Sequence, residues 1–109
     1  MSILEERERA FETKYAHEQE VQFRTVAQRN RLLGQWVSRL IGLPDSEAED
    51  YTKSLVERSV ERPDLQSLIA QVSNDLETRG HDLPRRALQQ KVDELTEVAR
   101  DQVFHGGVI

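Results

Sequence analysis

Residues 2–42 read SILEERERAFETKYAHEQEVQFRTVAQRNRLLGQWVSRLIG. This stretch contains no proline and no glycine before Gly34, and residues that favour the α-helix fill most of its positions. The first signal that ends a helix is Gly42-Leu43-Pro44. The stretch therefore predicts one helix of about 40 residues, which would be roughly 60 Å long at 1.5 Å per residue.

The predicted helix changes character near residue 20. Between Glu5 and Glu20 the only sizeable apolar side chains are Phe11 and Tyr15, whereas from Val21 onward apolar residues recur every three or four positions. The recurring residues are Val21, Phe23, Val26, Ala27, Leu33, Val37, Leu40 and Ile41. Polar residues take the opposite side of this half, namely Arg24, Gln28, Arg31, Gln35 and Arg39. The second half is thus expected to have a core face, and the first half is not.

Three shorter helices are predicted after Pro44. Ser46 and Glu49 have the spacing of a capping box at the start of the second helix, and Pro63 ends it. A third helix opens at Pro63 or Asp64 and runs to Gly80, and a fourth begins at Pro84. Since no strand pattern occurs, we expect an all-α protein, an antiparallel four-helix bundle whose long N-terminal helix has an exposed or flexible first part.

The shorter helices, at about 15 to 20 residues each, can cover only half of the first one. We therefore divide the chain into residues 1–20, a helical segment that becomes ordered on binding, and residues 21–109, the bundle. An isolated helix with so few apolar groups is marginal in water until a partner packs against it.

The composition narrows the class of protein. The chain has 109 residues, a net charge of −5 and no cysteine, so disulfides and thiolate metal sites are excluded. Because a net negative charge repels a phosphate backbone, the partner is expected to be another protein and not a nucleic acid. The N-terminus lacks the pattern of a signal peptide, and no run is apolar enough for direct membrane insertion, so we expect a soluble, cytoplasmic chain.

No catalytic constellation is found. His17, His81 and His105 lie in three segments without the spacing of metal ligands, and Gly106-Gly107 lacks the pattern of a phosphate-binding loop. We therefore predict a protein that is not an enzyme and that uses no cofactor and no metal.

The segment before residue 20 carries the candidate contacts. Leu4, Phe11 and Tyr15 lie within roughly 40° of each other around the helix, a narrow seam that fits a groove on a partner. The alternative is that Phe11 and Tyr15 fold back on the bundle; the shortage of covering chain favours the partner. His17, beside two glutamates, is either an ordinary exposed histidine or a charge switch near neutral pH.

Positions in the second half leave alternatives open. Leu32 and Trp36 lie off the main apolar face, with Arg29 on the flank of Trp36, so they form either an interface hot spot or a contact with a neighbouring helix. Asn30 interrupts the apolar stripe. It is a buried polar pin, a cap for a neighbouring helix end, or an interface residue.

Residues 7–36, RERAFETKYAHEQEVQFRTVAQRNRLLGQW, resemble the signature of the zeta subunit family, the ATPase inhibitor subunit of the bacterial F-type ATP synthase. The likeness covers about the first 43 residues. Glu18 stands where the family tends to have aspartate, and Gln28 where a second arginine is common.

The resemblance implies a function. Members of this family fold as four-helix bundles whose N-terminal segment enters a catalytic α/β subunit interface of the synthase, near the central rotor subunit, and blocks ATP hydrolysis by stopping reverse rotation. The chain would then be peripheral to the inner membrane through the synthase. On this basis the contacts would be Leu4, Arg7, Glu8, Arg9, Phe11, Glu12, Lys14, Tyr15, His17, Arg29, Arg31 and Trp36.

The rival reading is a helical adaptor or oligomerisation module in which the long helix pairs with a second copy. The inhibitor reading predicts a monomer when the protein is free, and sedimentation would distinguish the two.

Overall fold

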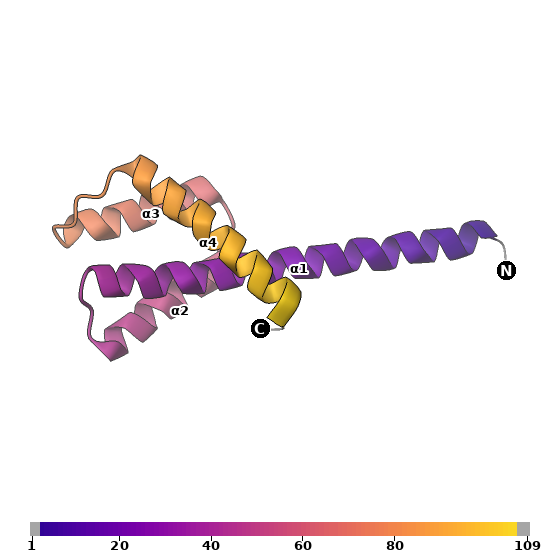
Figure 1. Cartoon of the computed structure of the whole chain (residues 1–109), viewed down its shortest axis with the longest axis horizontal. Helices are drawn as coiled ribbons and strands as arrows, with labels where there is room; N and C mark the ends of the chain where they lie inside the picture. The colour runs from indigo at the N-terminus through magenta and orange to yellow at the C-terminus, as the bar shows by residue number, and fades with distance from the viewer. Residues whose placement is uncertain (1–2, 107–109) are drawn as a thin grey trace.

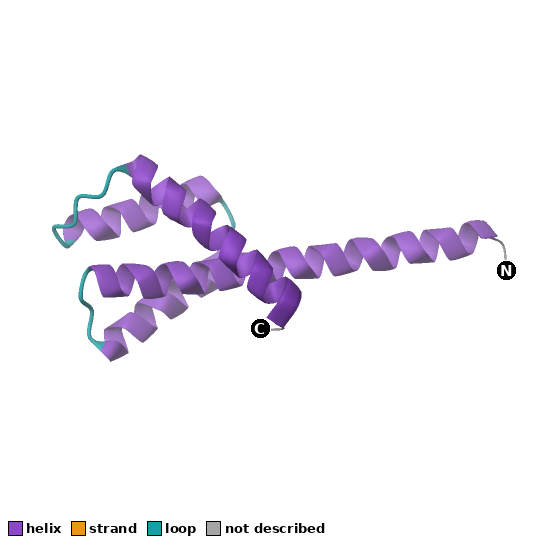
Figure 2. Ribbon diagram, in the orientation of Figure 1, coloured by secondary structure: helices purple, strands orange, loops and turns teal. Residues whose placement is uncertain are grey.

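The computed structural model describes the backbone of residues 3–106, and it describes the side chains of this range except those of residues 3–5 and Phe11. The predictions about the side chains of Leu4 and Phe11 therefore lie outside the described residues. The described chain consists of four helices joined by short loops (Figures 1 and 2): α1 (Ile3–Leu40), α2 (Asp45–Glu61), α3 (Leu65–Thr78) and α4 (Arg85–Gly106). The predicted all-α class is confirmed.

Glycines end α1 and α3 as the sequence predicts. Gly42 and Gly80 have φ angles of +69° and +76°, a left-handed conformation that glycine adopts without steric cost. In each case the next residue reaches back to the helix: Leu43 N–H donates to the Ser38 carbonyl at 2.9 Å, and His81 N–H donates to the Leu76 carbonyl at 2.8 Å. These bonds satisfy carbonyl groups that the helix leaves free at its end.

The starts of the helices agree with the sequence in two cases of three. The Asp64 side chain accepts from Gln66 N–H at 3.3 Å and caps α3, and the Pro84 carbonyl accepts the first backbone bond of α4, from Leu88. The capping box at Ser46 and Glu49 is wrong. α2 already begins at Asp45, and Pro44 supplies the first acceptor, so Ser46 lies inside the first turn.

α1 is the central helix of an antiparallel bundle. It packs against both α2 and α4, while α3 packs against α4 (Figure 1). The core combines the apolar stripes of all four helices, and its buried members are Leu33, Val37, Leu55, Leu68, Ile69, Val72, Leu76, Leu88, Val92 and Leu95. The predicted four-helix bundle is confirmed by these contacts.

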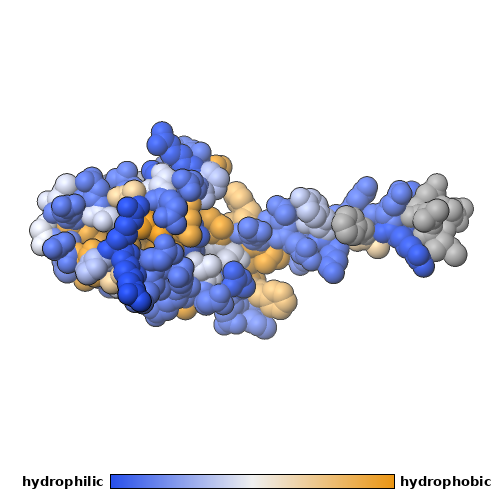
Figure 3. All heavy atoms as spheres, turned by 90° about the horizontal axis from the view of Figure 1, so that it is seen from above, coloured by the Kyte–Doolittle hydropathy of each residue, from blue (hydrophilic) through white to orange (hydrophobic). Residues whose placement is uncertain are grey.

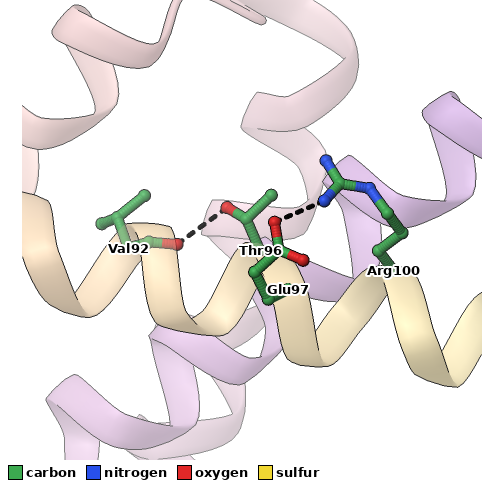
Figure 4. A network of polar contacts seen from close by, with 4 residues as sticks. All are labelled: Val92, Thr96, Glu97 and Arg100. Carbon is green, nitrogen blue, oxygen red and sulfur yellow. Dashed lines mark hydrogen bonds and ion pairs between the residues drawn. The ribbon is translucent and has the colours of Figure 1, made fainter.

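Two side-chain bonds lie within α4 (Figure 4). Thr96 Oγ1 donates to the Val92 carbonyl at 2.7 Å, and Arg100 Nη1 lies 2.5 Å from Glu97 Oε1. The pair of Glu97 and Arg100 is exposed, and such pairs add only tenths of a kcal/mol to stability.

α1 is too long for its neighbours to cover. Its 38 residues span about 57 Å, whereas α2, with 17 residues, spans about 26 Å. The described part of the molecule measures 64 × 26 × 23 Å, and the N-terminal part of α1 projects from the bundle along the longest dimension (Figure 1).

Two positions of α1 differ from the prediction. Phe23, expected in the core, is 54% exposed. It lies before Thr25, which is the first described residue of α1 that the neighbouring helices bury. Gln28, expected on the solvent side, is buried, because α4 packs on a second side of α1 and Gln28 Nε2 donates to Gln102 Oε1 at 2.8 Å. A single apolar stripe does not predict which residues are buried in a helix that packs against neighbours on two sides.

Candidate functional site

The candidate site is the projecting N-terminal part of α1, residues 3–20, which we call the arm. Every side chain that the structure describes here, at residues 6–10 and 12–20, is exposed, and Tyr15 is 57% exposed. In the space-filling view the projecting part is mostly hydrophilic, while hydrophobic surface gathers over the bundle (Figure 3). An aromatic side chain on such a thin, uncovered helix has no core of its own to enter.

Local ion pairs support the arm as a helix. Lys14 Nζ lies 4.0 Å from Glu18 Oε1, and Arg24 Nη2 lies 2.6 Å from Glu20 Oε1. Both pairs join residues four apart and are solvent-exposed, so each contributes only tenths of a kcal/mol. These pairs alone add little to the stability of the arm as a helix.

Most of the predicted contact residues lie together on the arm. Six charged or titratable ones are exposed there with Tyr15: Arg7, Glu8, Arg9, Glu12, Lys14 and His17. The helix presents them around its whole circumference, so that they do not form a pocket. Such a surface can bind a groove but cannot enclose a small substrate.

Arg29 and Asn30 form a buried polar pair in the bundle. Arg29 donates to Asn30 Oδ1 through Nε at 3.2 Å and Nη2 at 3.1 Å, and Asn30 Nδ2 donates to the Leu55 carbonyl of α2 at 2.7 Å. Burial lowers the pKa of the Arg29 guanidinium. Of the three roles left open for Asn30, the structure shows the polar pin, which joins α1 to α2.

Trp36 also belongs to the bundle. Together with Leu32 it packs against the core, and Lys91 Nζ of α4 lies 5.4 Å from the centre of its ring, within the range of a cation–π contact. Of the two roles left open for Leu32 and Trp36, the structure shows the contact with neighbouring helices and not an exposed hot spot. Arg31 is exposed and faces solvent beside α2, so the structure does not bring Arg29, Arg31 and Trp36 together with the arm.

Arg31 lines an open groove of about 850 Å³ between the end of α1 and the start of α2. Basic and acidic side chains line it together, among them Arg39, Lys53, Asp45 and Glu49. Sequence patterns missed this groove because its two sides come together only when the helices pack. Residues 3–106 contain no group of three or more histidines, aspartates or glutamates placed to hold a metal ion.

The described helices also lack a membrane span, since none between residues 3 and 106 combines enough length with enough apolar character. Within the described residues the fold is a four-helix bundle with one uncovered helical arm, which defines the class of small helical-bundle proteins.

Comparison with known families specifies the class. The model of the family described as ATPase inhibitor subunit zeta matches residues 1–102, nearly the whole chain, and the protein belongs to this family. The family name denotes a regulatory subunit associated with an ATPase. Neither the curated proteins nor the solved structures gave a match to the chain.

Proposed function

We propose that this protein inhibits ATP hydrolysis by an F-type ATP synthase, and that the arm does so by inserting between a catalytic α and β subunit near the central rotor. The observation that carries the proposal is the uncovered arm: α1 continues beyond the bundle with every described side chain exposed. Membership of the inhibitor family supplies the kind of partner.

The dimensions of the arm suit this role. A helix with its side chains is about 10–12 Å across, thin enough to lie between two subunits, and the bundle is too wide to follow it. The arm acts as a wedge that blocks rotation sterically, and the bundle limits how far the wedge enters. No catalytic group is required for this mechanism.

The energy of binding comes from the apolar seam of the arm. Full burial of one large apolar side chain contributes about 1.5–3 kcal/mol, and Phe11 and Tyr15 provide two such anchors. This gain offsets the entropy lost when the arm is ordered. We assign the direct contacts to the predicted contact residues of the arm and to exposed Arg31, whereas buried Arg29 and partly buried Trp36 hold α1 against its neighbours.

Deleting residues 1–17 tests the proposal. The deleted chain keeps every buried core residue, so we expect it to fold but to lose its inhibition of ATP hydrolysis by the purified synthase. The full chain is the control in the same assay. Inhibition by the deleted chain equal to that of the full chain would show that the arm is not the wedge.

The substitutions Phe11→Ala and Trp36→Ala locate the binding centre. Phe11→Ala removes a proposed anchor and should raise the concentration needed for half-inhibition more than tenfold, the equivalent of about 1.4 kcal/mol. Trp36→Ala removes a contact inside the bundle and should chiefly lower the melting temperature. If both variants lost inhibition equally while remaining folded, the binding centre would lie in the bundle.

A further inference from the structure

The charges of the arm are sorted by side around its apolar seam. The seam is the line of Leu4, Phe11 and Tyr15 along the helix, and angles around the helix are measured from the midpoint between Phe11 and Tyr15. At 100° per residue, Glu8 and Glu12 lie roughly 40° and 80° to one side. Arg7 and Lys14 lie roughly 60° and 80° to the other side. We call the first pair the acidic edge and the second the basic edge.

Both edges are available to a partner. All four side chains are exposed, and none of them pairs with a residue of the bundle within the described chain. Glu18 lies on the same side as the basic edge, nearer the bundle, where it is 4.0 Å from Lys14. The face opposite the seam has no such order, because Glu6, Arg9 and Glu20 mix both signs there.

Two buried contacts relate the edges to the bundle. Asn30 lies on the side of α1 that carries the acidic edge, and it bonds to Leu55 of α2 at 2.7 Å. Gln28 lies on the side that carries the basic edge, and it bonds to Gln102 of α4 at 2.8 Å. Since α1 is one continuous helix, the acidic edge lies on the side of α2 and the basic edge on the side of α4.

A second copy of the arm does not fit this surface. Helix pairing along the seam would also bring Glu8, Glu18 and Gln22 into the contact, because they occupy the intervening positions at spacings of three and four. Charged and polar residues at such positions weaken a coiled coil. The surface suits a groove with an apolar floor and two walls of opposite charge, such as a cleft between two different subunits.

We infer that the arm enters its partner in one rotational orientation, with Glu8 and Glu12 against a wall that bears lysine or arginine and Arg7 and Lys14 against a wall that bears carboxylates. This inference rests on the proposed function and adds the electrostatic character of the two walls. It also sets the orientation of the bundle, with α2 on the side of the basic wall. Charge complementarity of this kind gives specificity and register.

Exchange of the two edges tests the orientation. The variant Arg7→Glu/Glu8→Lys/Glu12→Lys/Lys14→Glu keeps the net charge, the numbers of acidic and basic residues, and the apolar seam. In the proposed orientation, however, each edge would then face a wall of its own charge. We expect the concentration for half-inhibition of ATP hydrolysis to rise at least tenfold, with helical content unchanged by circular dichroism.

A control inverts a pair of charges on the opposite face, at two positions that are not among the predicted contacts. The variant Glu20→Lys/Arg24→Glu also keeps the net charge, and it re-forms the pair between residues 20 and 24 with the signs reversed. We expect its inhibition to stay within about twofold of the natural chain, since each exposed pair contributes only tenths of a kcal/mol.

The outcomes separate the two proposals. If the deletion of residues 1–17 abolishes inhibition but the edge exchange and its control inhibit equally, the arm is the wedge and the single orientation is wrong. If the deleted chain still inhibits, the proposed function fails, and the orientation fails with it. Self-association of the full chain that the edge exchange abolishes would replace the partner with a second copy and overturn the inference.

Discussion

Gly34 shows how a single residue sets the distance between two helices. A Cβ atom at this position would lie 2.7 Å from Thr52 Cα in α2, a separation that packed atoms do not tolerate. The contact is with backbone, which cannot move aside as a flexible side chain can. Gly34 therefore permits the close approach of α1 and α2 that also lets Asn30 reach the Leu55 carbonyl.

Gly34→Ala should destabilise the protein. Alanine favours the helix by about 0.5–1 kcal/mol over glycine, but overpacking a tight contact costs about 1–3 kcal/mol. We expect a lower midpoint of denaturation in urea, and Gln35→Ala, at the exposed neighbouring position, should leave the midpoint nearly unchanged. A midpoint that rose on Gly34→Ala would mean that helix propensity outweighs the contact.

At the scale of helices, α2 and α3 share the core and are also joined by polar side chains. Tyr51 Oη donates to Asp75 Oδ2 at 2.8 Å, and Arg58 donates to the hydroxyl and carbonyl oxygens of Ser67. Burial, followed by the hydrogen bond and the negative charge of Asp75, raises the pKa of Tyr51 above its usual value. The pairing of these helices is thus linked to the protonation of one phenol.

The link predicts a loss of stability at high pH. A raised pKa means that the folded state holds the Tyr51 proton more tightly than the unfolded chain, in which tyrosine titrates near pH 10. This contribution to stability is complete below about pH 10 and is lost as the pH rises above that value. The free energy of unfolding should fall more steeply with alkaline pH in the natural protein than in Tyr51→Phe.

Urea unfolding at several pH values measures this slope, and Tyr15→Phe, at an exposed position of the arm, is the matched control. Equal slopes for the natural protein and Tyr51→Phe would show that the Tyr51–Asp75 bond does not couple α2 and α3 to pH. At neutral pH, Tyr51→Phe should cost about 0.5–1.5 kcal/mol for the lost hydrogen bond.

The whole molecule combines a four-helix bundle with an arm that projects from it. Among the described side chains, all buried apolar residues come from position 33 onward, so the described side chains of the arm add nothing to the core. The part of α1 beyond the bundle is therefore not explained by packing within the described chain, and this is the physical basis of the proposal that the arm binds a partner.

Removal of residues 1–17 should leave the melting temperature within about 2 °C of the full chain, because no core contact is lost. The helical signal in circular dichroism should fall only by the contribution of the deleted residues. A large drop in melting temperature would show that the arm packs against the bundle in solution, which is the fold-back alternative.

The sequence by itself determined the four helices, where α1 and α3 end, and the excess length of α1. These features follow from local rules: proline and glycine stop helices at Gly42 and Gly80, and apolar spacing marks the stripes. The motif in residues 7–36 also pointed to the family that matches the chain.

Tertiary structure alone decided the roles of side chains within the bundle. Gln28 is buried because α4 crosses α1 on a second side, Phe23 is exposed because the covering helices end before it, and Arg29 is held by Asn30. These outcomes depend on which helices meet and at what distance, and helical periodicity contains no information about either. The arm was predictable because it meets nothing within the described chain, whereas the bundle residues required knowledge of their neighbours.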